Sequence, residues 1–332
     1  MGDKNLTISD IANELGVSKT TVSRVISGKG RISEATRLKV QEYIKLHNYR
    51  PNVIAKSLAQ SKTFNIGVVL PTDSNLTEIP FFQSCLMGIC DVAVSFEYDV
   101  VVATITEEDI SQLKRIVQKN KVDGIILTRT TTNDLATAYL KEHHIPFVII
   151  GSSEDVEVIQ IDNNHIDGCA ELTSILIQYG YHHMALLGGN SRHVVNINRY
   201  EGFIKAFQDN KRIANEKLIH MNLTSKVMIE RAVDLMIDQE IDCIVCADDF
   251  ICSQVLARIN ERGYIIPKDI KIASFYDSAY LDNYNPPVTC LRIDVRGIGI
   301  EAGKCLINLI SQHEVAQKTL LDYELVLKKS TM

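Results

Sequence analysis

The sequence predicts a small all-α head followed by a larger α/β body made of two doubly wound lobes, each with a parallel sheet. Three observations favour this fold class. Helix-start residues and apolar residues at helical spacing fill positions 7–46. From residue 65 onward, short apolar runs alternate with longer amphipathic stretches. The net charge also differs between the two parts of the chain. Residues 1–62 hold eleven Lys and Arg and five Asp and Glu, which gives a net charge of +6. The whole chain carries −6, so the residues after 62 carry −12.

The head begins with a helix-start pattern at Thr7, which stands three positions before an acidic residue and just ahead of an apolar run. Gly16 ends this first helix, because glycine accepts the positive φ of a tight turn. Ser18 can cap a second helix over residues 19–27, and Ser33 can open a third. Two short helices joined by a glycine-containing turn and braced by a third are typical of a helix-turn-helix.

The charge of this head favours a nucleic-acid contact, because a small basic module precedes a large acidic body. Residues 7–12, 16–26 and 48–52 together resemble the DNA-binding head of the lac repressor (LacI/GalR) family, and the resemblance runs the full length of the chain. It implies a sequence-specific DNA-binding transcriptional regulator, in the first place a repressor of carbohydrate-utilisation genes. The head is expected to span residues 1–62.

The resemblance assigns roles to single residues of the head. Lys19, Thr20 and Arg24 match the family's base readers at the start of the recognition helix, where Arg and Lys suit guanine and Thr can touch a thymine methyl. Other positions match phosphate contacts, which fix register without reading sequence, or add basic charge; they are Thr7, Ser18, Thr21 and Arg31. The alternative is that Lys19 and Arg24 belong to an ordinary solvated helix face.

Residues 51–60 are expected to form a conditional hinge helix. Asn52 can cap it and Ala55 favours helix, yet fewer than about ten residues do not hold a helix alone in water. In the family, this helix forms on operator DNA and inserts a leucine into the minor groove, which kinks the duplex. Leu58 matches that leucine, so Asn52, Ala55 and Leu58 join the expected DNA contacts. The alternative is a plain linker in which Leu58 packs on the body.

The body is expected to consist of repeated β-α units. Its apolar runs are short and do not alternate with polar residues, as in parallel strands covered on both faces. Strands are expected at 65–70, 99–104, 123–127, 147–150, 158–161, 184–187, 242–246, 271–275 and 288–293. Helices are expected at 81–96, 107–120, 133–143, 165–179, 199–209, 226–239, 249–262 and 296–312. There are about twice as many units as one such sheet needs, which indicates two lobes.

The family resemblance supplies the topology of the body. It implies two lobes like those of periplasmic sugar-binding proteins, with the chain crossing between them three times. The effector-binding and dimerisation domain would span 63–332, with an N-lobe of about 64–161 plus 293–325 and a C-lobe of about 162–292. Ligands of such sheets bind beyond the carboxyl ends of the strands, here in the cleft between the lobes.

Residues that follow the strands are therefore the candidate effector contacts. The set is Phe82, Gln83, Thr128, Arg129, His193, Asn198, Arg199, Asp248, Phe275 and Tyr276. Arg199 stands in an Arg-x-x-Gly-aromatic motif, whose arginine reaches sugar hydroxyls in the family. Asp248 matches an Asn or Asp that accepts from the ligand, and Asp249 is expected to cap the next helix. The alternatives are a core anchor at Phe82, ordinary turn chemistry after the third strand and a structural ion pair at Arg199.

Residues 273–278 depart from the family pattern. Many members place an Asp that binds sugar hydroxyls where this chain has Tyr276, and Asp277 falls one position later. The hydrogen bonding to a ligand at this position is therefore expected to differ from that of the family. Phe275 or Tyr276 can instead stack on a sugar face. The segment is similar to that of the maltose-regulator branch, which also lacks this acid.

Several functional classes are disfavoured. No cofactor is expected, because neither a GxGxxG motif nor a P-loop occurs. No metal site is expected, because Cys243 and Cys246 face opposite sides of an expected strand and no second Cys or His pair follows. The adjacent Asp248 and Asp249 point in different directions, so we expect no enzyme activity. The sequence has neither a signal peptide nor an apolar run of membrane length, and we expect a cytoplasmic protein that does not contact the membrane.

The expected assembly is a homodimer that presents two heads to a pseudo-palindromic double-stranded DNA operator, with a small sugar or sugar phosphate as effector. Exposed apolar stretches such as 81–94 are candidate dimer contacts. Three alternatives stay open: the same regulator controlled by a protein partner, a sugar-binding protein without DNA function, and a sugar-processing enzyme. Whether the ligand releases or promotes DNA binding also stays open.

Overall fold

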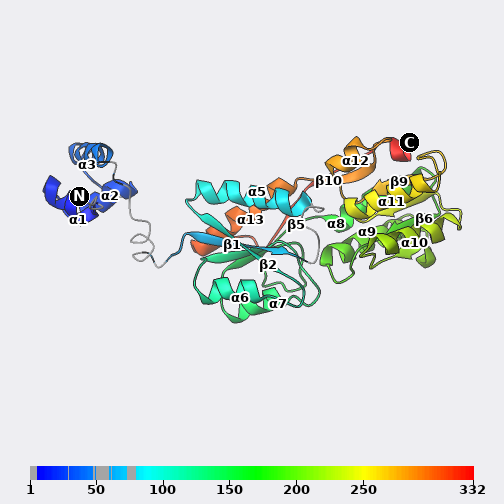
Figure 1. The fold of residues 1–332 in the computed structure, drawn as a ribbon, viewed down its shortest axis with the longest axis horizontal. Helices are drawn as coiled ribbons and strands as arrows, with labels where there is room; N and C mark the ends of the chain where they lie inside the picture. The colour runs from blue at the N-terminus through cyan, green and yellow to red at the C-terminus, as the bar shows by residue number, and fades with distance from the viewer. Residues whose placement is uncertain (1–5, 29, 48, 50–59, 61, 73–79) are drawn as a thin grey trace. The chain divides into compact units, whose positions relative to one another are not determined.

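The computed structural model of the chain describes residues 6–28, 30–47, 49, 60, 62–72 and 80–332 (Figure 1). The chain divides into two units, Met1–Thr63 and Phe64–Met332, each with its own apolar core. The predicted hinge residues Asn52, Ala55 and Leu58 lie outside the described residues. In the described part of the chain, no helix is both long enough and apolar enough to span a membrane.

The head contains the three predicted helices, α1 (Ile8–Leu15), α2 (Lys19–Ser27) and α3 (Glu34–Leu46). A reciprocal capping box begins α1: the Thr7 N–H donates to the Asp10 carboxylate at 2.9 Å, and the Asp10 N–H donates to Thr7 Oγ1 at 3.3 Å. Gly16 ends the helix with φ 66°. Ser18 Oγ then accepts the Thr21 N–H at 3.0 Å and starts α2.

The core of the head takes side chains from all three helices and from the segment after them. Its buried members are Ile11, Ala12, Val22, Val25, Val40 and Tyr49. Lys39 Nζ also donates to the carbonyl oxygen of Leu15 at 3.2 Å, which ties α3 to the end of α1. The first two helices are therefore held at a fixed angle by a third, as the helix-turn-helix pattern predicts.

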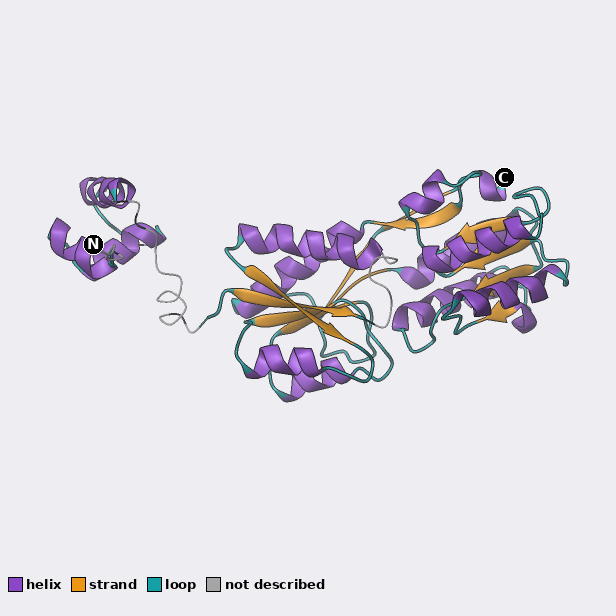
Figure 2. Ribbon diagram, in the orientation of Figure 1, coloured by secondary structure: helices purple, strands orange, loops and turns teal. Residues whose placement is uncertain are grey.

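The first sheet of the body has six parallel strands in the order β11-β5-β4-β3-β1-β2 (Figure 2). The strands are β1 (Asn65–Pro71), β2 (Asp99–Ile105), β3 (Gly124–Leu127), β4 (Phe147–Ile150), β5 (Gln160–Asn163) and β11 (Lys318–Leu321). One face carries α5 (Pro80–Ser95) and α13 (Val295–Ile310), and the other carries α6 (Ser111–Gln118) and α7 (Leu135–Glu142). Adjacent residues Val68 and Val69 pack in these two different clusters.

The second sheet has the order β12-β10-β9-β8-β6-β7, and only β12 runs antiparallel to its neighbour. The strands are β6 (Met184–Leu187), β7 (Ile219–His220), β8 (Cys243–Cys246), β9 (Lys271–Ser274), β10 (Thr289–Ile293) and β12 (Tyr323–Val326). One face carries α8 (His165–Gln178) and α9 (Val194–Asp209), and the other carries α10 (Lys226–Ile237) and α11 (Asp249–Glu261). Three short helices complete the lobe: η1 (Glu216–Leu218), α12 (Ala279–Asn283) and η2 (Lys329–Thr331).

The positions of Cys243 and Cys246 show that the side chains of β8 pack on both faces of the second sheet. Both are fully buried, Cys243 in the cluster under α8 and α9 and Cys246 in the cluster under α10 and α11. They lie on opposite faces of the sheet, as their spacing in a strand predicts. All eight cysteines of the chain are free thiols.

The predicted strands each match an observed strand to within two residues, whereas the helix boundaries differ more. The helix expected at 107–120 begins only at Ser111, and the one expected at 199–209 begins earlier, at Val194. Strands β7, β11 and β12 and helix α12 were not predicted. Edge strands β11 and β12 are half-exposed and contain polar residues, so they lack the continuous apolar run that marks the other strands.

The chain crosses between the two sheets three times, after Asn163, after Ile293 and at Asp322. Asn163 Nδ2 donates to the carbonyl oxygens of Leu321 at 3.3 Å and Asp322 at 2.9 Å, which binds the first crossing to the third. The third crossing falls before residue 325, the expected end of the N-lobe, because β12 pairs with β10 of the second sheet.

Candidate functional site

Helix α2 of the head presents a polar surface. Lys19, Thr20 and Arg24 are exposed, whereas Val22 and Val25 are buried in the head core. Gly30 has φ 88° and leaves room for the arginine, since a Cβ at this position would lie 3.1 Å from Arg24 Cδ. The three predicted base readers therefore share one helix, on the part of it that the core does not use.

The predicted phosphate contacts stand at helix starts. Thr7 Oγ1 donates to the Asp10 carboxylate at 2.6 Å, and Ser18 Oγ lies 2.8 Å from Thr21 Oγ1. The first N–H groups of a helix lack intrahelical partners and attract phosphate oxygens, so these positions suit backbone contacts with DNA. Arg31 is exposed beyond the end of α2.

In the body, two loops from different sheets meet: residues 128–132 after β3 and residues 190–194 after β6. The Thr132 N–H donates to the Arg192 carbonyl oxygen at 2.9 Å, and the Val194 N–H donates to the Thr130 carbonyl oxygen at 3.2 Å. The two loops are thus joined through their backbones. This contact closes one side of the space between the lobes.

A carboxylate reinforces this junction. Glu107, just after β2, accepts from Arg192 Nε at 2.8 Å and Asn190 Nδ2 at 2.9 Å, and lies 3.1 Å from His193 Nε2. We call these four residues the Glu107 contact. His193, expected to bind the effector, instead contacts the other lobe. Glu107 was not predicted as a site residue, although its place directly after a strand was an available signal.

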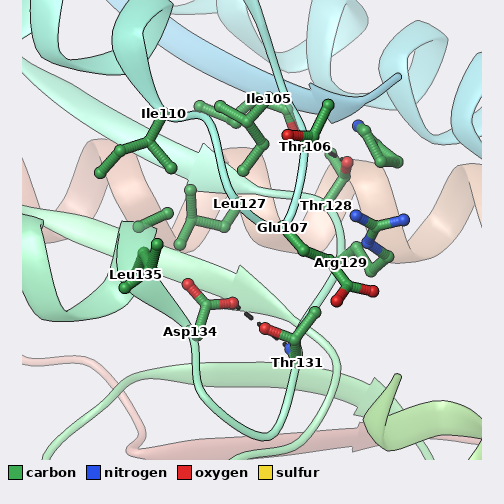
Figure 3. A pocket seen from close by; sticks show the side chains of 13 residues that line it. Ile105, Thr106, Glu107, Ile110, Leu127, Thr128, Arg129, Thr131, Asp134 and Leu135 are labelled. Carbon is green, nitrogen blue, oxygen red and sulfur yellow. Dashed lines mark hydrogen bonds between the residues drawn. The ribbon is translucent and has the colours of Figure 1, made fainter. Parts of the chain in front are cut away.

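The strand ends beside Glu107 enclose only a small hollow. Figure 3 shows Glu107, Arg129 and Thr131 around it, with the Thr131 N–H donating to the Asp134 carboxylate at 3.3 Å. The hollow has a volume of about 20 Å³, room for about one water. Thr128 is buried and its Oγ1 donates to the Val69 carbonyl oxygen at 2.7 Å. The hydroxyl of Thr128 is therefore used by the fold rather than left for a ligand.

A second cavity, of about 690 Å³, lies between the lobes. Its walls come from the starts of α5 and α13 in the first lobe and from α11 and the segment after β9 in the second. The lining side chains include Pro80, Ser84, Asp249, Phe250, Tyr276, Ser278, Tyr280, Ile293, Asp294 and Arg296. This size and this mixture of apolar walls with a few polar groups are typical of small-molecule sites.

Asp249 lines this cavity, and the charge of Arg199, which is not itself a lining residue, acts on the Asp249 carboxylate. Arg199 on α9 is only 7% exposed, and in the described part of the chain no group accepts a hydrogen bond from its buried Nε. Burial and the neighbouring carboxylate of Asp248 raise the pKa of Asp249 to about 6, against the opposing effects of Ser278 and the Arg199 guanidinium. A strongly shifted pKa in a cleft is frequent at functional sites.

Of the two adjacent aspartates, Asp248 and not Asp249 caps the helix. Asp248 is the N-cap of α11, since its Oδ1 accepts the Ile251 N–H at 2.8 Å. Asp249 is the first helical residue, and it is Asp249 that lines the cavity. The expectation that Asp249 caps the helix was wrong, because α11 begins at Asp249 and the N-cap position is therefore Asp248.

Tyr276 occupies the position where many relatives have the sugar-binding acid. It is 8% exposed, lines the cavity and lies edge-on to Phe81, with 6.3 Å between the ring centroids. Burial raises the pKa of its phenol above the usual value. Asp277, one residue later, forms ion pairs with Arg292 at 2.7 Å and Lys328 at 3.4 Å. Its carboxylate is therefore held by the second lobe and not by the cavity.

The other predicted effector residues do not line this cavity. Phe275 is 1% exposed in the core under α8 and α9, so the expectation that it stacks on a ligand is wrong: adjacent residues at the end of β9 face opposite sides. Phe82 packs in the core under α5 and α13, as the alternative of a core anchor states. Gln83 is exposed and Asn198 is half-buried. Phe81, which was not predicted, contacts Tyr276 instead.

A basic helix-turn-helix head joined to a two-lobed body with an inter-lobe cavity defines the class of ligand-responsive DNA-binding regulators. Residues 7–52 match the sequence profile described as "Bacterial regulatory proteins, lacI family", and residues 173–331 match the "Periplasmic binding protein-like domain". The chain belongs to the lacI family of bacterial transcriptional regulators.

The similarity to known proteins extends over nearly the whole chain. The HTH-type transcriptional regulator MalR of Streptococcus pneumoniae is 31% identical over 92% of this chain and 92% of its own, and MalR of Staphylococcus xylosus is 30% identical over 93% of each. Among solved structures, the lac repressor dimer bound to operator and the anti-inducer ONPF has a TM-score of 0.81 at 24% identity, covering 99% of this chain and 100% of that one. The CelR–cellobiose complex has a TM-score of 0.74 at 24% identity, covering 98% and 99%. At this identity, the two structures show a shared fold.

Proposed function

We propose that the protein represses carbohydrate-utilisation genes and that a small sugar or sugar phosphate in the inter-lobe cavity switches its operator binding. The observation that carries this proposal is the cavity of about 690 Å³ at which Asp249 and Tyr276 meet beside the buried Arg199. A guanidinium, a carboxylate and an aromatic ring suit the hydroxyls and the apolar face of a sugar. The names of the relatives support this ligand class, since one solved relative is a cellobiose complex and another is a probable maltose operon repressor.

In this proposal, the head supplies sequence readout and the body supplies control. Lys19, Thr20 and Arg24 read base edges in the major groove, and a homodimer places two heads on the half-sites of a pseudo-palindromic operator. The ligand acts by binding one arrangement of the lobes more tightly than the other. Such coupling between two sites typically amounts to about 1–3 kcal/mol.

The proposal assigns no catalytic step to the chain. Asp248 is committed to capping α11 and Asp249 faces an arginine, so the two carboxylates do not flank a common substrate position. A regulator of this kind works in the cytoplasm, where its DNA lies.

Operator binding by the full-length protein, measured at one fixed salt concentration, tests the proposal because phosphate contacts make affinity strongly salt-dependent. The DNA would be a palindromic site from upstream of the protein's own gene, titrated with free sugars and sugar phosphates. We expect specific binding that at least one of these compounds shifts about tenfold or more. If the protein binds operator specifically and no compound shifts this binding, the sugar proposal is overturned. We would then infer that a protein partner controls operator binding.

Arg199→Ala provides the matched variant for this test, with Arg212→Ala on the surface of the same lobe as its control. Arg199→Ala should lose the response to sugar while its operator affinity without sugar stays that of the parent, because Arg199 lies in the body. Arg212→Ala should respond like the parent. A full sugar response in Arg199→Ala would remove this residue from the site.

A further inference from the structure

The end of β9 brings a phenol to the cavity in place of a carboxylate. Tyr276 lines the cavity, whereas the next residue, Asp277, is only 9% exposed at its side chain and lies in a separate ionic cluster with Arg292 and Lys328. Lys328 in turn pairs with Asp282 at 2.7 Å. Asp277 would have to give up two ion pairs to reach a ligand. The acid that accepts ligand hydroxyls must therefore come from another element.

Helix α11 supplies such an acid. Asp249 lines the same cavity as Tyr276 and Ser278, and its charge interacts with both Tyr276 and Arg199. The N-terminal N–H groups of α11 do not occupy its carboxylate as a cap, since Asp248 caps this helix. In the described part of the chain, no Lys or Arg lies within ion-pair distance of Asp249. It is a half-buried carboxylate that interacts with Ser278 and with its own backbone N–H, and its remaining lone pairs can accept from a ligand.

We propose that Asp249 accepts hydrogen bonds from the hydroxyls of the ligand, opposite Arg199, and that the cavity takes an uncharged polyhydroxylated compound, a free sugar rather than its phosphate ester. This inference rests on the proposed function, because it concerns the ligand of the same cavity. Many relatives have an aspartate at the end of β9, where this chain has Tyr276. In this proposal, Asp249 of α11 supplies the carboxylate instead.

The charges around the cavity exclude a phosphate. Two of its charged lining residues, Asp249 and Asp294, are acidic, and the third, Arg296, pairs with Asp91 at 2.6 Å. Two of the helix starts at the cavity are already capped by carboxylates: Asp248 caps α11, and Asp294 caps α13 by accepting the Gly297 N–H at 2.8 Å. A phosphate placed at Arg199 would meet the neighbouring Asp249 as a like charge.

The apolar walls fit the other face of a free sugar. Tyr276 and Phe81 form an edge-on aromatic pair beside the cavity, and Pro80 and Phe250 line it. A sugar ring presents C–H groups on one face and hydroxyls at its rim, so it can place the first against these side chains and the second toward Asp249 and Arg199.

Calorimetric titration of the full-length protein tests the proposal. The probes are glucose, maltose and cellobiose, compared with glucose 6-phosphate and fructose 1,6-bisphosphate. We expect at least one free sugar to bind, and both phosphate esters to bind about tenfold or more weakly than that sugar. Asp249→Asn should weaken binding of that sugar about tenfold or more, as expected for one lost hydrogen bond to a charged group.

Asp234→Asn is the control, because Asp234 makes a half-buried ion pair with Arg258 on the outer helices of the same lobe and does not line the cavity. Its sugar affinity should equal that of the parent. Thermal unfolding checks that each variant folds. If Asp249→Asn does not fold, Asp249→Ser serves as a second variant. Operator affinity without sugar should stay at the parent value in Asp234→Asn.

The outcomes separate the two proposals. Unchanged sugar affinity in Asp249→Asn and Asp249→Ser overturns the role of Asp249 and leaves the sugar-responsive regulator intact. Tighter binding of a phosphate ester than of every free sugar overturns the charge argument, again with the regulator intact. Specific operator binding without binding of any probe overturns both this inference and the sugar proposal.

Discussion

Among single residues, Asp249 connects ligand binding to pH. Burial and the adjacent Asp248 raise the pKa of Asp249 to about 6. Ligand hydroxyls donate to the ionised carboxylate, so the ligand binds the deprotonated form. The charged or titratable groups that face it are Asp248, Arg199, Tyr276, Asp294 and Arg296. Below the pKa, binding must displace a proton, and affinity falls.

We therefore expect sugar affinity to be constant above about pH 7 and to decrease as the pH is lowered through about 6, approaching tenfold per pH unit. Calorimetry in buffers of equal ionic strength measures this. Asp249→Asn should remove the decrease along with most of the affinity. A parent affinity that is flat down to about pH 5 would contradict the assignment.

Arg24 is the corresponding residue of the head. Arg24→Ala should weaken binding to the specific operator by about 1–3 kcal/mol and relax the preference at one base pair, because a side chain on base edges carries discrimination. Binding to a set of single-base operator variants measures both effects. Lys45→Ala, which removes an exposed charge at the end of α3, should change affinity without changing the preference. An unaltered preference in Arg24→Ala would show that this residue does not read a base.

Single residues are also where prediction from sequence was least certain. The assignment of Arg199 to the ligand stays a prediction, whereas the N-cap of α11 proved to be Asp248 and not Asp249, and Phe275 proved to be core. A shift of one position reverses the face of a strand residue and changes which residue caps a helix. Apolar runs locate the helices and strands. They do not determine, to within one residue, where an element ends and therefore which face or cap position each terminal residue takes.

Among elements, the junction of residues 128–132 with residues 190–194 joins the two lobes through backbone hydrogen bonds. The Glu107 contact adds a charged acceptor to two backbone hydrogen bonds. Glu107 is 11% exposed at its side chain while Arg192 is 53% exposed, so solvent screens part of this interaction. The contact pre-organises the cleft, which reduces the cost of closing it around a ligand.

Glu107→Ala should therefore lower both stability and sugar affinity. We expect the free energy of unfolding to fall by about 1 kcal/mol and the lobes to separate more in the absence of ligand, which enlarges the radius of gyration seen by small-angle scattering. Glu108→Ala removes an exposed neighbour of the same charge and should leave both quantities unchanged. Equal scattering curves for the two variants would show that Glu107 does not hold the lobes together.

The elements themselves were largely predictable. Strands covered by helices on both faces must be apolar throughout, and this made nine of them recognisable. Strands β11 and β12 each lie at a sheet edge, where half-exposure permits residues such as Lys318 and Glu324 and removes the apolar signal. Helix α12 has only five residues, too few for a periodic pattern.

For the whole molecule, the division into two units predicts that ligand binding survives without the head. The unit Phe64–Met332 contains its own core and the entire cavity. A shortened chain that starts at Phe64 should bind the same sugar with a Kd within about twofold of the full-length value and should not bind operator. Calorimetry and a DNA-binding assay measure the two quantities. Loss of sugar binding in a folded shortened chain would mean that the head takes part in the ligand site.

The number of lobes could be inferred from the count of β-α units, but their topology could not. Periodicity assigns residues 296–312 to a helix without indicating that this helix, α13, covers the first sheet, far back in the chain. The family resemblance supplied that information. The return of the chain also explains why β10 and α13, adjacent in sequence, belong to different lobes.

This return has a consequence for how the protein is made. The core of the first lobe needs Val295, Ile298 and Leu306 of α13, and its sheet needs β11 at residues 318–321. A ribosome delivers these only after the whole run from β6 to β10, so the second lobe has most of its strands while the first still exposes the apolar face that α13 will cover. The lobe that begins first during translation therefore keeps one apolar face uncovered until α13 has been made, after β10 of the second lobe.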